Sequence, residues 1–102
     1  MSQPKLTLEL LNGPLDGHIV PLESETTWSK EGDSPLTFPW DTQLGTPQAR
    51  LFPQNGKWWL EHDRNASRNT RNNMERVTTK AQLAEGDLLK ASESWMLVSK
   101  IS

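Results

Sequence analysis

The 102-residue chain contains no cysteine. A disulfide framework, a thiolate nucleophile and a cysteine-ligated zinc site are therefore excluded. No run of about 18 apolar residues occurs, so the sequence predicts no membrane insertion. The first five residues lead directly into an alternating segment without the apolar stretch of a signal peptide, and the expected location is the cytoplasm.

An excess of positive charge is also absent. Eleven Lys and Arg stand against thirteen Asp and Glu, which gives a formal net charge of −2. Because a general nucleic-acid binder needs a basic face to displace counterions from phosphate, no nucleic-acid partner is expected. His18 and His62 are far apart in the sequence, and neither has a partner at metal-ligand spacing. No metal or small-molecule cofactor is expected.

The usual constellations of catalytic residues are missing as well. No nucleophile stands at motif spacing from a base, and no glycine-rich phosphate loop precedes a helix. His62 and Asp63 are adjacent, so on a strand their side chains would point to opposite faces and could not form a dyad. The sequence predicts a protein that is not an enzyme.

What the chain does have is a series of short β-like segments. They are separated by Gly, Pro and Asn turns at roughly ten-residue spacing, which is typical of an all-β sandwich or barrel. Five Trp and two Phe supply large side chains for a single core. The expected strands are residues 6–11, 18–22, 26–29, 36–38, 48–52, 57–61, 76–79, 87–90 and 94–99. The only plausible helical piece is residues 80–85, which is too short to stand alone.

The segment Asp63–Met74 is the most unusual part of the sequence. It holds four Asn and three Arg, and its last residue is its one large apolar side chain. This composition predicts a long exposed loop. Binding residues concentrate on loops that a rigid β scaffold holds, so the segment is the first candidate for recognition. The alternative is that its arginines form only a solvated face.

Three tryptophans carry open alternatives. Trp58 and Trp59 are adjacent on a predicted strand, so one should enter the core while the other faces a covering loop or a partner. Trp40 stands in a predicted turn between two strands. It is either an exposed aromatic anchor for a partner or a plug at one end of the sandwich.

Further signals follow one another in a fixed order. They are Gly13-Pro14-x-x-Gly17, Trp28-Ser29-Lys30, Leu36–Asp41, Gln48–Leu51, Trp58–Glu61, Asp63–Met74, Leu83–Asp87 and Trp95–Leu97. In this order and spacing the chain resembles a forkhead-associated (FHA) domain, with residues 1–5 as an N-terminal tail and residues 6–101 as one domain. The resemblance implies an all-β, FHA-like (SMAD/FHA) sandwich of two antiparallel sheets with long loops at one end. Domains of this family read phosphothreonine peptides.

The sequence departs from the family pattern where the family binds phosphate. The Gly-Arg pair of the family reads Ser29-Lys30, and its two phosphate-binding serines fall on Gly45 and Ala66. Neither of the last two residues has a hydroxyl, and Lys offers a flexible point charge where Arg offers a planar fork. The structural His of the family falls on Gln48.

The remaining positions of the binding loop are partly kept. Arg68 replaces an Asn that holds the bound peptide in the family, and Asn69 replaces a Gly. Asn adopts left-handed backbone more readily than most residues, so the second change is tolerable. Thr70 and Asn73 match the family, and they either contact a ligand or hold the loop through local hydrogen bonds.

The resemblance and its departures predict a non-catalytic protein–protein interaction module with a degenerate phosphothreonine pocket, acting in assembly or signalling. The alternative is a divergent phosphothreonine-peptide reader with a pocket rebuilt from Lys30, Arg64, Arg68 and Arg71. The expected partner is a protein, and only the alternative requires it to be phosphorylated on Thr. The candidate partner-binding residues are Lys30, Gly45, Arg64, Ala66, Arg68, Asn69, Thr70, Arg71 and Asn73.

Overall fold

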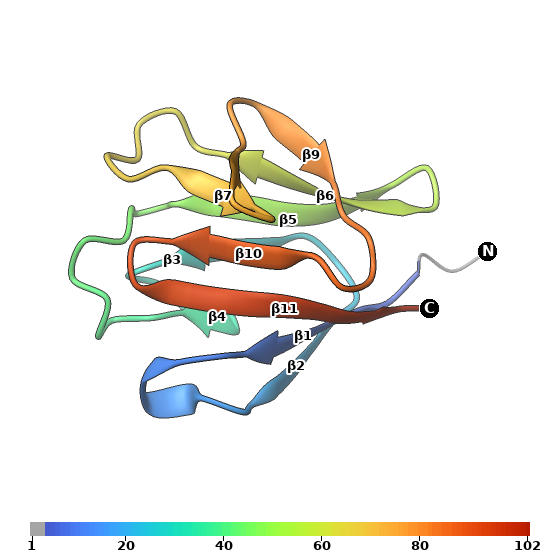
Figure 1. Cartoon of the computed structure of the whole chain (residues 1–102), viewed down its shortest axis with the longest axis horizontal. Coiled ribbons are helices and arrows are strands. Elements are labelled where there is room, and N and C mark those ends of the chain that lie inside the picture. The colour runs from blue at the N-terminus through green and yellow to red at the C-terminus, as the bar shows by residue number, and fades with distance from the viewer. Residues whose placement is uncertain (1–3) are drawn as a thin grey trace.

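Two β-sheets packed face to face make up the computed structural model, which describes residues 4–102 (Figure 1). The expected tail over residues 1–5 lies partly outside the described residues. Lys5 and Ser102 exchange backbone hydrogen bonds, with N···O distances of 2.7 and 3.0 Å. The Pro4 carbonyl accepts a hydrogen bond of 2.7 Å from the indole Nε1 of Trp58. The two ends of the described chain therefore lie together.

The first sheet has six strands in the order β2-β1-β11-β10-β7-β8, and all its pairs are antiparallel. Its strands are β1 (Leu6–Leu10), β2 (Ile19–Leu22), β7 (Thr70–Asn72), β8 (Glu75–Arg76), β10 (Leu88–Ala91) and β11 (Ser94–Ile101). Burial alternates along β1 and along most of β11, because one face of the sheet covers the core and the other faces solvent.

The second sheet has five strands in the order β4-β3-β5-β6-β9. Its strands are β3 (Thr26–Ser29), β4 (Leu36–Thr37), β5 (Ala49–Gln54), β6 (Lys57–His62) and β9 (Lys80–Gln82). The pair β3–β4 is parallel, so the expectation of purely antiparallel sheets is wrong at this edge. The loop of residues 30–35 turns the chain back, so that β4 runs in the same direction as β3.

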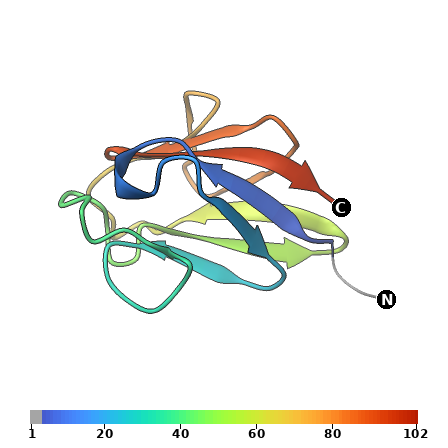
Figure 2. The same cartoon turned by 90° about the horizontal axis from the view of Figure 1, so that it is seen from below.

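The core lies between the two sheets, which are stacked one above the other in the view of Figure 2. Trp28 and Trp58 are fully buried there. Trp59 points to the other face of β6 and is half-buried, and the Nζ of Lys80 lies 4.9 Å from the centroid of its ring. The prediction that the two adjacent tryptophans face opposite sides is therefore confirmed. The turn Asn55–Gly56 between β5 and β6 has positive φ at both residues, as a tight hairpin requires.

Residues 80–85, the one segment with a helical signal in the sequence, contain no helix. Lys80–Gln82 forms β9 and pairs with β6, and Leu83 enters the core with 3% exposure. The free edge of β6 offers backbone partners that a helix of six residues cannot match, so tertiary pairing overrides local propensity. Among the described residues the one helical element is a 3-10 turn at Gly13–Leu15.

Two further sequence predictions need correction. The strand expected over residues 76–79 is limited to Arg76 at the end of β8, after which Val77 leaves the ladder and enters the core. The exposed loop expected over Asp63–Met74 is interrupted by β7, where Thr70 is fully buried. A polar Thr can be buried here because its hydroxyl has two hydrogen-bond partners. The exposed loop proper is residues 63–69.

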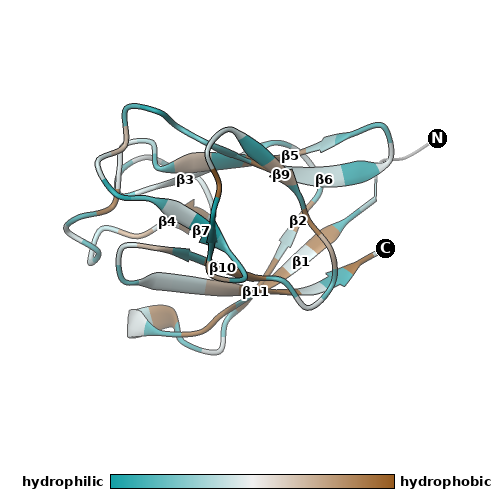
Figure 3. Cartoon of the chain, turned by 45° about the horizontal axis from the view of Figure 1, so that its top comes forward, coloured by the Kyte–Doolittle hydropathy of each residue, from teal (hydrophilic) through white to brown (hydrophobic). Residues whose placement is uncertain are grey.

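Several loops meet at the end of the sandwich opposite the chain termini (Figure 1). They are residues 30–35, residues 42–48, residues 63–69 and the turn between β10 and β11. Figure 3 shows that the loop between β6 and β7 is mostly hydrophilic. Among residues 4–102 no helix has the length and apolar character needed to cross a membrane.

Candidate functional site

A groove lies between the loop of residues 42–48 and the loop of residues 63–69. It has a volume of about 330 Å³ and is lined by residues 42–47 on one side and by Asp63 and residues 65–67 on the other. The Arg68 guanidinium donates a hydrogen bond of 3.0 Å to the Gln43 side chain across it. We call this hollow the recognition groove.

Gln48 joins the two loops through the hydrogen bonds of its buried side chain. Its side chain is completely buried, and its Oε1 accepts a hydrogen bond of 2.9 Å from the Gly45 amide. Its Nε2 donates to the Arg68 carbonyl at 2.8 Å and to the Thr70 hydroxyl at 2.9 Å. A single amide therefore supplies one acceptor and two donors, in keeping with its chemistry. The sequence marked Gln48 as a departure from the family but did not identify it as the residue that joins the loops.

Thr70 extends this network to the second sheet. Its hydroxyl lies 2.8 Å from Nδ1 of His62, to which it can donate its one proton. Burial lowers the pKa of His62 below its ordinary value; the nearby Asp63 carboxylate opposes this shift and the Arg76 charge adds to it. An imidazole whose Nδ1 carries no proton accepts this hydrogen bond, and the lowered pKa favours the neutral form. Of the candidate binding residues, Thr70 is the most deeply buried.

Gly45 and Ala66 lie close together in the recognition groove. A Cβ atom placed on Gly45 would lie 2.9 Å from the Cβ of Ala66 and 2.8 Å from the Pro47 carbonyl oxygen. Both distances are shorter than van der Waals contact, so a serine at position 45 would require the loops to separate. The half-buried Lys30 is joined to this point by a hydrogen bond of 3.1 Å from its amide to the Gly45 carbonyl.

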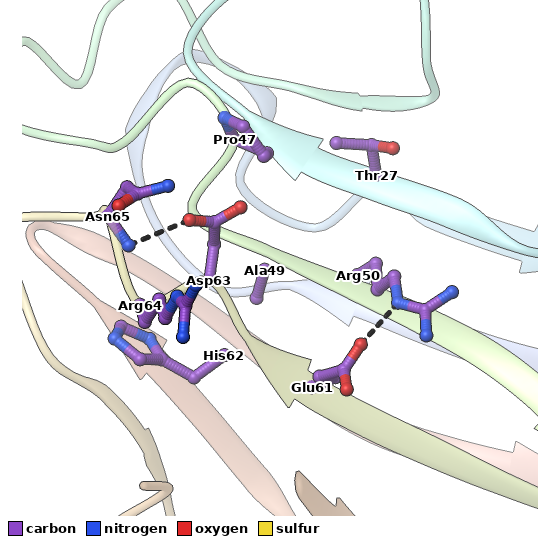
Figure 4. Close-up of a pocket in the computed structure, with 9 residues that line it drawn as sticks. All are labelled: Thr27, Pro47, Ala49, Arg50, Glu61, His62, Asp63, Arg64 and Asn65. Atoms are coloured by element: carbon purple, nitrogen blue, oxygen red, sulfur yellow. Dashed lines mark hydrogen bonds and ion pairs between the residues drawn. The ribbon is translucent and has the colours of Figure 1, made fainter. Parts of the chain in front are cut away.

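A second hollow of about 280 Å³ adjoins the groove on the outer face of the second sheet (Figure 4). Pro47, Asp63 and Asn65 line both. The Asn65 amide donates a hydrogen bond of 2.8 Å to the Asp63 carboxylate, which fixes the start of the loop. Arg64 also lines this outer hollow, beside His62.

One arginine in the outer hollow is already neutralised. Arg50 contacts Glu61 at 2.5 Å and Glu25 at 2.8 Å. The hydrogen bond that Arg50 donates to Glu61 raises the pKa of Arg50 above its ordinary value. Arg50 therefore forms ion pairs on the face of the sheet and is not free to bind an anionic ligand.

The third hollow, of about 190 Å³, lies between β7 and the turn that follows β10. Its lining is Arg68, Asn69, Arg71, Lys90, Ala91 and Ser92. We call it the basic hollow. The four cations expected to rebuild a phosphate pocket are thus divided, since Arg64 lines the outer hollow and Arg71 lines the basic hollow.

Asn73 takes part in the scaffold. Its amide donates to the Asp87 carboxylate at 2.9 Å, and its Oδ1 accepts from the Leu88 amide at 3.0 Å. Its φ of 53° places it in the left-handed region that Asn tolerates. Because both ends of its side chain are occupied within the protein, Asn73 holds the turn between β7 and β8.

Asp41 is a residue that sequence reasoning missed. It is 1% exposed, and its carboxylate accepts hydrogen bonds from the Ser92 hydroxyl at 2.6 Å, the Ser94 hydroxyl at 2.7 Å and the Glu93 amide at 3.0 Å. These contacts tie the start of the 42–48 loop to the β10–β11 turn. The sequence carries no local signal for them, because the partners are about fifty residues away.

Trp40 closes the same end of the sandwich. Its ring stacks on Phe38 with centroids 5.0 Å apart, and it packs against the core while staying partly exposed. Its indole nitrogen would lie 2.8 Å from a Cβ placed on Gly13, so that glycine is needed for the close approach. Among residues 4–102 no group of three His, Asp or Glu side chains could hold a metal ion.

Comparison with known proteins identifies the fold. No family model matches the sequence, and no curated protein matches it either. Among solved structures, an FHA domain of a hypothetical protein from Arabidopsis thaliana is 23% identical with a TM-score of 0.86, covering 100% of this chain and 90% of that one. The chain is therefore an FHA-like domain in its fold, as the sequence resemblance predicted.

Two further structures agree. An FHA domain solved in work on phosphothreonine-dependent FHA interactions is 25% identical with a TM-score of 0.80, covering 94% of this chain and 96% of that one. The FHA domain of FhaA, in complex with the intracellular domain of a second protein, is 25% identical with a TM-score of 0.76. That match covers 90% of this chain and 97% of the other.

Proposed function

We propose that the chain is a non-catalytic protein–protein interaction module on an FHA-like scaffold, with a recognition groove that does not depend on phosphothreonine. Its solved neighbours support an interaction role, since one was studied for phosphothreonine-dependent interactions and another is complexed with a protein domain. The proposed setting is a cytoplasmic assembly or signalling complex.

The contact between Gly45 and Ala66 is the observation that carries this proposal. Phosphate carries nearly two negative charges and needs several fixed donors. Neither residue has a hydroxyl, and a Cβ on Gly45 would already be too close to Ala66. The hydroxyls that line the groove belong to Thr42, Thr46 and Ser67. The three backbone amides there are also engaged: Gly45 donates to Gln48, Ala66 to Asp63, and Lys30 to Gly45.

The test is a titration of ¹⁵N-labelled protein with a degenerate phosphothreonine peptide library and with its unphosphorylated twin. The amides of residues 42–47 and 63–69 are followed. We expect the two libraries to give the same shifts, because neither Gly45 nor Ala66 has a hydroxyl and the backbone amides of both are already bonded within the protein. Shifts in these loops that occur only with the phosphorylated library would contradict the proposal.

A divergent phosphothreonine reader is the second candidate function. The observation in its favour is that Arg68 reaches the groove rim through its bond to Gln43. If this function holds, Lys30→Ala or Arg68→Ala should weaken binding of the phosphorylated library, and added salt should weaken it further. Unchanged binding in both variants would remove this candidate.

A further inference from the structure

Three cations form a row on three neighbouring strands of the first sheet. In the strand register Arg76 is paired with Arg71, and Arg71 is paired with Lys90. The next residue in the row is Trp95, the partner of Lys90 on β11. We call Arg76, Arg71 and Lys90 the basic row. The neighbours of Lys90 on β10 are buried in the core, so Lys90 itself points to the outer face of the sheet.

The arrangement is unfavourable for the isolated domain. Like charges directly opposite each other on neighbouring strands repel and destabilise a sheet. Among residues 4–102 the only ion pairs are those of Arg50, so the basic row has no carboxylate partner. The Nζ of Lys90 lies 5.0 Å from the centroid of the Trp95 ring, and Arg71 donates to the Met74 carbonyl at 3.2 Å. These contacts position the charges without neutralising them.

The basic hollow gives this positively charged surface a concave part. It lies beside the row, between β7 and the turn after β10, and Arg68 joins Arg71 and Lys90 in its lining. Its remaining lining residues are Asn69, Ala91 and Ser92, none of which carries charge. Strands β7, β10 and β11 lie side by side on this face (Figure 1). The surface is therefore a cationic strip with a shallow hollow and an aromatic side chain at one end.

We propose that the basic row and the basic hollow dock an acidic segment of a protein partner, with Asp or Glu carboxylates supplying the missing counter-charge. A protein segment fits better than nucleic acid, because four cations on a chain of net charge −2 are few for a phosphate backbone. The basic row lies on a sheet face away from the Gly45–Ala66 contact, and Arg68 joins the basic hollow to the rim of the recognition groove. The proposal goes beyond the recognition groove and does not depend on it.

The test measures fluorescence anisotropy of a labelled twelve-residue peptide of alternating Glu and Gly, beside its Gln–Gly twin. We expect binding of the Glu peptide only, lost at high salt because exposed charge pairs are screened. The double variant Arg71→Gln, Lys90→Gln should bind about 5-fold more weakly or worse. Lys57→Gln is the matched control, because Lys57 is exposed next to the Asn55–Gly56 turn and should leave binding unchanged.

Three outcomes would overturn the proposal: no binding of the Glu peptide, equal binding by the double variant, or tighter binding of a single-stranded oligonucleotide of equal charge. The double variant should also unfold at the same or a higher temperature in low salt, since two opposed cations are removed. A lower temperature would mean that the row stabilises the fold, and the charge argument would fail. No peptide here carries phosphate, so these results are independent of the groove titration.

Discussion

At the scale of single residues, Gln48 shows how one buried amide can hold two loops in place. All its polar atoms are used, and it reaches from the Gly45 amide to the Thr70 hydroxyl. A buried donor or acceptor that loses its partner costs about 1–3 kcal/mol. Replacing Gln48 therefore affects both walls of the recognition groove at once.

We expect Gln48→Leu to lower the free energy of unfolding by about 2–4 kcal/mol, because it leaves more than one buried group without a partner. Urea denaturation measures the loss. Gln43→Leu is the control, because Gln43 is exposed and its bond to Arg68 lies at the surface. If both variants lost the same small amount, the network through Gln48 would not hold the loops.

The crowding between positions 45 and 66 gives a second prediction. Gly45→Ala should destabilise the domain by about 1–3 kcal/mol, the usual cost of adding a methyl group to a packed site. Ala66→Gly in the same chain should recover part of that loss, because it removes one of the three atoms that the new Cβ meets. A double-mutant cycle measures the coupling. Simple additivity of the two changes would contradict the contact.

The lowered pKa of His62 predicts a pH dependence of stability. Unfolding returns the imidazole to its ordinary pKa of 6.5, so below this pH the unfolded chain binds the proton more readily than the folded one. The free energy of unfolding should fall as the pH drops from 6.5 toward the lowered pKa, by at most about 1.4 kcal/mol per pH unit. The variant His62→Gln should lack this contribution to the slope. Denaturation at several pH values, with pH 8 as reference, measures it.

At the scale of elements, the strands were largely predictable and the connections were not. The β5–β6 hairpin followed from its Asn55–Gly56 turn, and the closing strand β11 followed from its alternation. The segment of residues 80–85 looked helical because its propensities are local, whereas β9 exists only through its pairing with β6. Likewise the composition of the 63–74 segment indicated a loop, and the buried Thr70 depends on partners elsewhere in the chain.

The candidate site was predictable to a similar extent. The resemblance placed Gly45 and Ala66 at the positions of the family's two phosphate-binding serines, and the structure brings the two residues together. The cations were expected to converge, but strand pairing sends Arg71 to the outer face of the first sheet, away from Arg64. Side-chain direction depends on register, which the sequence of the loop alone does not contain.

The link from Asp41 to the β10–β11 turn belongs to this scale, because it joins two elements. We expect Asp41→Ala to lower the free energy of unfolding by about 2–4 kcal/mol, since two hydroxyls and an amide lose their acceptor. It should also speed hydrogen exchange in residues 42–47. Asp33→Ala, in an exposed loop, is the control. Unchanged exchange in residues 42–47 would mean that the link does not order the loop.

At the scale of the whole molecule, the two surfaces face different directions. The recognition groove opens at the loop end, and the basic row lies on the outer face of the first sheet (Figure 1). Arg68 contributes to both, since it bonds to Gln43 across the groove and lines the basic hollow. A partner could bind both through separate segments, and the combined affinity would exceed either alone by the gain in effective concentration.

The hydrogen bonds between Lys5 and Ser102 have a consequence for circular permutation of the chain. Because Lys5 and Ser102 lie together, a short Gly-Ser linker could join these two residues, and new ends could be opened at the exposed Asn55–Gly56 turn. Such a circular permutant should fold with the same pattern of amide shifts in both loops of the groove. The order in which the strands leave the ribosome would change while the finished sandwich stayed the same.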